Sequence, residues 1–151
     1  MPHARAYSDA SNIALGVVYG HSWSYIKFKG RFFWLTDTPI VFKEMYAAVY
    51  CIAVFGPRMS NTFIKMYTDN TAVYSCINSG TSKDNQLMGL LRALYFYTTK
   101  YCIHYRAYWL STVDNECSDS ISRLQFDRFR KLCPLADTDP TPVIDIVTDF
   151  V

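Results

Sequence analysis

Four acidic residues stand at points in the sequence where a carboxylate could do chemistry. Asp9 lies in an apolar stretch typical of a strand, Glu44 lies one turn inside a helical stretch, Asp69 closes another strand, and Asp119 lies in a late helix. Asp is depleted from strands, so an Asp within a strand is unusual. The functional interpretation of Asp9 rests on the three other acids. Each acid also has an ordinary interpretation, as a turn Asp, a helix-surface Glu, a strand-end Asp or a helix-cap Asp.

The chemistry open to these acids depends on their coming together. Packed carboxylates repel one another unless they are protonated or bound to cations. Mg²⁺ prefers hard oxygen ligands and keeps waters and substrate phosphates in its shell. Two such ions about 4 Å apart can activate a water and stabilise the leaving oxygen of a phosphodiester. If the four acids come together in the fold, they would therefore support metal-dependent phosphodiester hydrolysis.

The elements that must position the acids begin with strands. Residues 5–19, 21–28 and 31–35 are predicted as three strands, with Gly30 as a turn signal, and short connections favour an antiparallel meander. Further strands are predicted over 62–68 and 103–110. These two require a crossover and should be parallel, with the site outside their carboxyl ends. If the first and fourth strands are neighbours, Asp9 and Asp69 face each other.

Helices are predicted over 41–55, 71–78 and 86–100, and a last one holds Asp119 after the loop 111–115, with Asn115 as its expected cap. The fold class is therefore α/β: a mixed five-stranded sheet, three antiparallel strands then two parallel, with helices on both faces. We expect one domain over residues 1–133, followed by an extended tail or linker over 134–151, where Asp, Thr and Pro dominate.

Composition sets broad limits. The chain has 151 residues, half of them hydrophobic, and its net charge of +2 neither requires nor excludes a nucleic-acid partner. No run of about eighteen apolar residues is evident, so no membrane span is expected. The five cysteines are scattered, odd in number and form no Cys-x-x-Cys pair. We therefore expect reduced, mostly buried thiols in an intracellular compartment, whether cytoplasm or nucleus.

Four segments around the acids resemble the ribonuclease H of reverse-transcribing elements. They are residues 8–11 (Ser-Asp-Ala-Ser), 43–48 (Lys-Glu-Met-Tyr-Ala-Ala), 67–72 (Tyr-Thr-Asp-Asn-Thr-Ala) and 115–123. The last resembles the Asn-x-x-Ala-Asp-x-Leu-Ser-Arg signature of retrotransposon polyproteins, with Ser118 in place of Ala. Residues 124–130 and 139–142 resemble the segment before the recombinase in tyrosine-recombinase (DIRS-type) retrotransposons. Hepadnavirus ribonuclease H is a weaker match. The resemblance spans about residues 5–142.

The resemblance implies a ribonuclease H-like fold and two-metal endonuclease activity on the RNA strand of RNA–DNA hybrids. Asp9, Glu44, Asp69 and Asp119 would hold two Mg²⁺ ions, with Mn²⁺ as a substitute. Reverse transcriptase and recombinase domains would be covalently linked partners. Small polar groups beside the acids could read the 2′-hydroxyl that distinguishes RNA; these are Ser11, Asn12, Asn70 and Thr71. A helix cap is a competing interpretation of Asn70.

Three departures keep a second function open. Loop 111–115 lacks the His that many family members carry, the connection 79–84 leaves no room for a basic handle, and Pro-Ile-Val at 39–41 replaces a DNA-phosphate pocket. The alternative is a catalytically weak or inactive module that binds nucleic acid or acts as a spacer. A basic cluster near the end, Arg123, Arg128, Arg130 and Lys131, contacts phosphate or ends an amphipathic helix whose Phe126 and Phe129 pack on the sheet.

Overall fold

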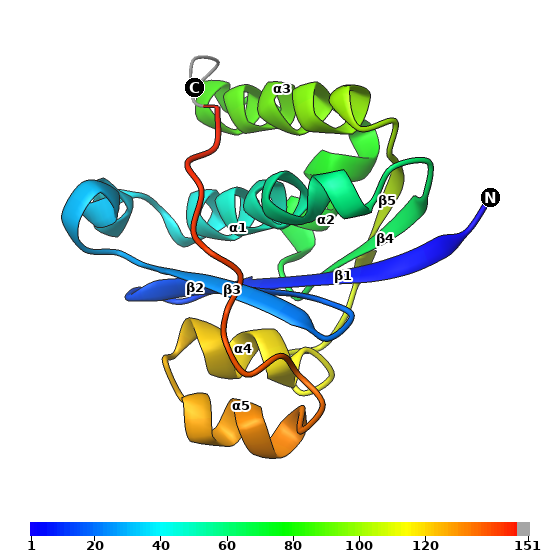
Figure 1. The fold of residues 1–151 in the computed structure, drawn as a ribbon. Coiled ribbons are helices and arrows are strands. Elements are labelled where there is room, and N and C mark those ends of the chain that lie inside the picture. Colours follow the sequence, from blue (N-terminus) through cyan, green and yellow to red (C-terminus); the bar gives the residue numbers. More distant parts are fainter. Residues whose placement is uncertain (148–151) are drawn as a thin grey trace.

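The computed structural model describes residues 1–147 and shows a five-stranded sheet between two layers of helices (Figure 1). Its strands are β1 (His3–Ala10), β2 (Ala14–Tyr19), β3 (Ser22–Lys27), β4 (Phe63–Thr68) and β5 (His104–Trp109), in the order β3-β2-β1-β4-β5. The pairs β1–β2 and β2–β3 are antiparallel, whereas β1–β4 and β4–β5 are parallel. The predicted mixed sheet is confirmed, with β1 and β4 as central neighbours.

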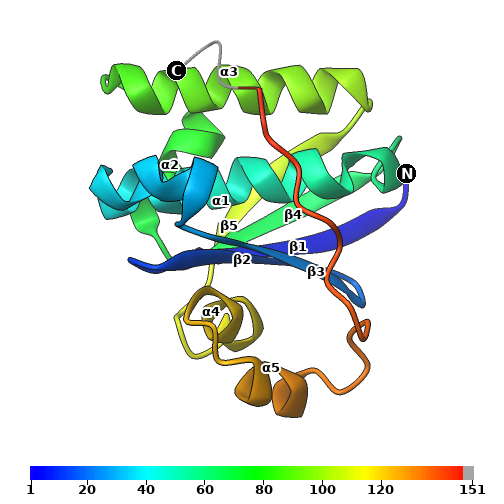
Figure 2. The ribbon, with the colours of Figure 1, turned by 60° about the vertical axis from the view of Figure 1, so that its left-hand side comes forward.

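Helices cover both faces, as predicted (Figures 1 and 2). On one side lie α1 (Ile40–Phe55) and α2 (Thr71–Ser79), with α3 (Asn85–Lys100) packed on the outer side of α1, and on the other side lie α4 (Glu116–Ser122) and α5 (Phe126–Leu132). Two 3-10 segments, η1 (Gly30–Asp37) and η2 (Gly56–Arg58), flank α1. The core lies between the sheet and α1, where Met45, Val49 and Ile52 are fully buried. Their three-and-four spacing makes the stripe that packs on the sheet.

Two of the predicted strands are wrong. Residues 5–19 form two strands, because Ser11 closes a turn: its N–H donates to Ala14 O (2.9 Å) and its Oγ accepts from Ile13 N (3.2 Å). Asp9 thus lies at the end of β1. Residues 31–35 belong to η1, which buries Phe32 and Leu35, three positions apart. In a strand these two side chains would point to opposite faces.

One stretch of the described residues, Ile40–Arg58, is long and apolar enough to cross a membrane by length and composition, with a mean hydropathy of 1.4. Its apolar window is 78% buried inside the fold. The helix packs against β1, β2 and α3. This apolar stretch is therefore explained by its place as the central core helix.

The prediction that all cysteines are reduced is wrong, because Cys117 and Cys133 form a disulfide. The pair is 16 positions apart in sequence, and the packing of α4 against α5 brings the two Cα atoms to 6.7 Å. No local spacing motif could signal a bond that depends on this packing. Cys51 and Cys76 are buried free thiols, and Cys102 is an exposed one.

After a turn at residues 134–135, residues 137–141 follow the start of the edge strand β3, and the chain then runs past α1 to α3 (Figure 1). Asp137 N–H donates to His21 O (2.8 Å), Thr141 N–H donates to Trp23 O (2.7 Å), and the Trp23 indole donates to Asp137 O (2.8 Å). Farther on, Ile146 is buried in the main core. The described part of the predicted tail therefore packs on the fold. A domain boundary at residue 134 stays a prediction.

At the opposite edge of the sheet, one side chain covers the middle of β5. Asn78, near the end of α2, donates from Nδ2 to Ala107 O (3.0 Å) and accepts from Ala107 N–H at Oδ1 (2.8 Å). The amide thus occupies the donor and acceptor of Ala107 in the middle of β5, as a peptide group of a neighbouring strand would.

Candidate active site

Three acids from three elements meet at the carboxyl ends of the central strands. Asp9 lies near the end of β1, Asp69 directly follows β4, and Glu44 lies on α1, which packs across β1. One potential ligand atom from each lies within 4.8 Å of the other two. Because β1 and β4 are parallel neighbours, their carboxyl ends fall at the same edge. The pairing therefore brings Asp9 and Asp69 together, and α1 adds Glu44.

Burial gives these acids unusual electrostatics. Asp9 and Glu44 are only 3% and 5% exposed. Desolvation raises the pKa of Asp9 to about 7, aided by repulsion from Asp69 and opposed by a hydrogen bond from Ser122. Desolvation also raises the pKa of Glu44, further still, with repulsion from Asp9 and Asp69 adding to it. Without a cation, the cluster therefore favours protonated carboxyls at neutral pH.

The acid cluster fits a divalent cation. Glu44 Oε2 is buried and, among residues 1–147, is the one buried side-chain oxygen or nitrogen without a hydrogen-bond partner. An unpaired buried carboxylate oxygen is costly. Carboxylate oxygens are the ligands that Mg²⁺ and Mn²⁺ prefer. A cation bound among the three acids would give Glu44 Oε2 a partner and relieve the repulsion.

Asp119 lies apart from this cluster, although it lines the same cleft, which has a volume of about 480 Å³. Its side chain is buried, and both oxygens are engaged: Oδ1 accepts from Arg123 Nε (3.1 Å) and Oδ2 from Arg128 Nη1 (2.9 Å). The structure thus brings three of the four predicted acids together. The fourth lies on the cleft wall, neutralised by two arginines.

The helix that carries Asp119 is seated closely on β2. A Cβ built on Gly16 would lie 2.6 Å from Ile121 Cβ and 2.9 Å from Ser118 O. Only a residue without a side chain permits this approach. Asn115 adds a second link, since its Nδ2 donates to Ser8 O (3.0 Å) and its Oδ1 accepts from Ser118 Oγ (2.7 Å). The prediction of Asn115 as a side-chain cap is therefore wrong, because its amide joins α4 to β1.

The four predicted substrate-binding residues differ in their surroundings. Ser11 and Asn12 line the cleft, and the Ser11 hydroxyl donates to Ser122 O (2.6 Å). Asn70 caps α2, its Oδ1 accepting from Val73 N–H (3.0 Å), so the helix-cap interpretation is confirmed. Thr71 is exposed at the start of α2 and is absent from the cleft lining. Substrate contact by any of the four stays a prediction.

Two hydroxyl groups that sequence reasoning missed hold the acids in place. Ser122 Oγ donates to Asp9 Oδ2 (2.7 Å), and Thr112 Oγ1 donates to Asp69 Oδ2 (3.0 Å). Ser122 is the Ser of the retrotransposon-like signature in residues 115–123, so that resemblance could have pointed to it. Thr112 lies in the loop without His, and nothing in its local sequence marks it.

The basic cluster after α4 has a structural explanation. Phe129 is buried and its ring lies 4.9 Å from that of Trp23, between centroids. Arg130 donates to Ala136 O (2.6 Å), while Arg123 and Arg128 pair with Asp119. Phe126 and Phe129 pack on the sheet, as the helix-end interpretation predicts, and the helix end forms the separate helix α5; phosphate contact by the basic residues stays a prediction.

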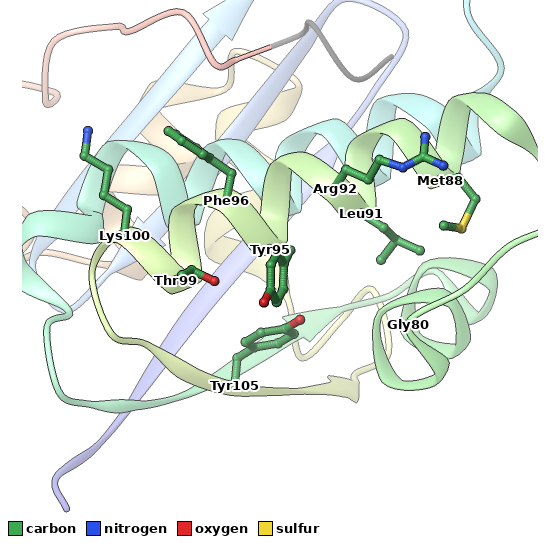
Figure 3. Close-up of a pocket in the computed structure, with 9 residues that line it drawn as sticks. All are labelled: Gly80, Met88, Leu91, Arg92, Tyr95, Phe96, Thr99, Lys100 and Tyr105. Carbon is green, nitrogen blue, oxygen red and sulfur yellow. The ribbon is translucent and has the colours of Figure 1, made fainter.

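A larger cavity, of about 630 Å³, lies away from the acids between α3, the end of α2 and β5. Figure 3 shows Tyr95 of α3 and Tyr105 of β5 pointing toward each other across it. Its lining is mainly apolar, with Arg92 and Lys100 as its charged residues and no carboxylate. This cavity has no group suited to hydrolysis, so the smaller acidic cleft is the candidate active site.

Comparisons with known proteins bear on the fold. No protein-family profile matches the sequence, and no curated protein shows significant sequence similarity. The RNase H1 of the halophilic archaeon Halobacterium salinarum NRC-1 has 17% identity and a TM-score of 0.62, covering 83% of this chain and 98% of its own. LC11-RNase H1, isolated from compost by a metagenomic approach, has 15% identity and a TM-score of 0.61, covering 85% and 98%. This chain therefore has a ribonuclease H-like fold.

Proposed function

We propose that this protein is a metal-dependent endonuclease that hydrolyses the RNA strand of RNA–DNA hybrids during reverse transcription of a retroelement. The observation that carries the proposal is the meeting of Asp9, Glu44 and Asp69 within 4.8 Å, with Glu44 Oε2 buried and unpartnered. The fold shared with two RNase H1 structures supports it. The four sequence blocks that resemble retroelement ribonuclease H supply the element type and the linked polymerase and recombinase domains.

The chain's own residues would prepare the site for hydrolysis. Asp9, Glu44 and Asp69 would hold divalent ions, which supply Lewis acidity at the phosphodiester when bound. Ser122 and Thr112 fix one oxygen of Asp9 and one of Asp69, so these carboxylates are pre-oriented. Asp119 would join a second ion only after exchanging at least one arginine partner. Arg123, exposed on the cleft wall, is placed to meet a phosphate.

The test is a cleavage assay with labelled RNA–DNA hybrid, RNA duplex and DNA duplex, each with Mg²⁺ or Mn²⁺. We expect cleavage of the RNA in the hybrid, giving 5′-phosphate and 3′-hydroxyl ends, and no cleavage by Asp69→Asn. The matched control is Asp139→Asn, which removes one exposed carboxyl far along the chain. Cleavage that survives excess chelator would contradict the metal mechanism.

A second candidate function is a catalytically weak or inactive ribonuclease H-like module that binds nucleic acid or acts as a spacer. The pairing of Asp119 with two arginines favours it, because this pairing leaves three acids for the metals. The same assay separates the two functions. Hybrid binding without cleavage at any Mn²⁺ concentration would establish the second.

A further inference from the structure

One part of the sheet is open on the side that carries α4 and α5. Helix α4 packs on β2 and β1, and among the described residues no helix lies over this side of β4 and β5 (Figures 1 and 2). Alternate side chains of a strand point to the same side. The open face is therefore made by the odd-numbered residues from 3 to 7 and from 63 to 67, and by the even-numbered residues from 104 to 108 that pair with them.

A row of three cations crosses the open face. Arg5 pairs in register with Lys65, and Lys65 with Arg106. Both arginines are exposed, and none of the three forms a salt bridge within residues 1–147. Neighbouring strands are about 4.8 Å apart, and like charges directly opposite destabilise a sheet. The fold thus keeps three adjacent positive charges without an acid to offset them, which suits a polyanion.

Aromatic rows flank the cations on both sides. On the side nearer the acidic cleft, the rings of Tyr7 and Tyr67 stack at 5.0 Å, and Tyr67 lies 5.6 Å from Tyr108, between centroids. On the other side, Phe63 stacks with His3 at 5.0 Å. The row of tyrosines ends at Tyr108 on the edge strand, whose ring is tilted by 34° from that of Tyr67 and has Lys65 Nζ 5.7 Å from its centroid. Cations interleaved with stacked aromatic rings are typical of surfaces that bind single-stranded nucleic acid.

We propose that the open face binds single-stranded nucleic acid, with phosphates along the Arg5–Lys65–Arg106 row and an unpaired base stacked on Tyr108. A duplex keeps its bases stacked on one another, whereas a single strand offers base faces to aromatic side chains. Tyr7 precedes Asp9 by two residues on β1, so a strand on this face leads to the acidic cleft. This binding needs no metal and stands apart from the proposed hydrolysis.

The first test removes the cations. Binding of a fluorescein-labelled single-stranded DNA is followed by anisotropy in excess chelator, as salt rises from about 50 mM. We expect the variant Arg5→Gln/Lys65→Gln/Arg106→Gln to reduce the slope of log K against log salt by about 2, since each phosphate contact with a single strand contributes about 0.7. The control Lys83→Gln/Arg92→Gln/Lys100→Gln removes three exposed cations from the other layer and should keep the slope.

Folding does not confound this test, because removing like charges should leave the melting temperature unchanged or raise it.

A second test compares Tyr108→Leu with Tyr108→Phe: loss of stacking should weaken binding about tenfold, while the ring-preserving variant binds like the wild type. A DNA duplex should show no difference between these variants. Equal salt slopes for the two triple variants, or no single-strand binding by the wild type, would overturn the proposal. The face would then be free for a protein partner.

Discussion

Glu44 shows how a single residue ties stability to metal and to pH. Burial raises the pKa of Asp9 to about 7 and raises that of Glu44 further. In the unfolded chain both pKa values are near 4. At a pH between the unfolded and the folded pKa values, the folded protein binds more protons than the unfolded chain, so metal-free stability should fall as pH rises through this range. We expect the metal-free melting temperature to fall from about pH 5 to about pH 8, and Mg²⁺ to restore it most at the higher pH.

Glu44→Gln tests this assignment, because it keeps the shape of the side chain and removes its charge. Metal-free thermal scans should show a shallower fall with pH than the wild type, together with a smaller gain from Mg²⁺. The exposed control Asp139→Asn should follow the wild type. If Glu44→Gln kept the wild-type pH dependence, the buried carboxylate would not be its source.

Arg128 offers a test of the fourth acid. Its guanidinium engages Asp119 Oδ2, and its side chain is 38% exposed. If Asp119 serves a second ion, Arg128→Gln should lower the Mn²⁺ concentration for half-maximal cleavage about twofold to fivefold, because such an ion pair contributes at most about 1 kcal/mol. Arg128→Lys should change it less, and Asp119→Asn should reduce cleavage severely but leave hybrid binding intact. Normal turnover by Asp119→Asn would show that Asp119 is not a metal ligand and that the site consists of three acids.

Sequence reasoning identified the acids because a carboxylate at the end of a parallel strand is informative by position alone. It could not foresee that Asp119 is held by Arg123 and Arg128. These pairs depend on how α5 folds back on α4. The hydroxyl partners of the acids were hidden for a similar reason, since Ser122 lies 113 positions from Asp9.

Among the elements, the α4–α5 pair is cross-linked by the Cys117–Cys133 disulfide. A loop of about this length is expected to contribute about 3 kcal/mol to stability. Cys117→Ser/Cys133→Ser should therefore lower the unfolding free energy by about that amount in urea titrations, and a reductant should do the same to the wild type. The control Cys102→Ser, at an exposed free thiol, should match the wild type. An unchanged urea midpoint in the double variant would contradict this assignment.

The strands and helices from residue 62 to residue 110 were predictable because sequence signals mark where each of them begins and ends. Asn70 and Asp84 cap α2 and α3, and Gly80 ends α2 in a left-handed conformation. The first part of the chain was harder. A nearly continuous apolar run concealed the Ser11 turn, and the aromatic residues of η1 have strand propensity although their buried positions are three apart.

The whole molecule depends on the segment that follows α5. A chain ending at residue 133 would lose the hydrogen bonds to His21 and Trp23 and the buried Ile146. We expect it to be less stable by at least about 2 kcal/mol, from one buried aliphatic side chain and several hydrogen bonds. Urea titration followed by tryptophan fluorescence would measure this. A truncated chain as stable as the full one would place the domain boundary at residue 134.

The amide of Asn78 has a consequence for how this protein meets other copies of itself. Its two hydrogen bonds satisfy Ala107 at the centre of the exposed sheet edge. An incoming strand would have to displace that amide and, with it, the end of α2. Because residues 137–141 follow the start of β3 at the other edge, strand exchange and fibril-like growth are obstructed at both edges of the sheet. We therefore expect strand pairing at this edge to require release of the end of α2, which would couple the solubility of the protein to the stability of that short helix.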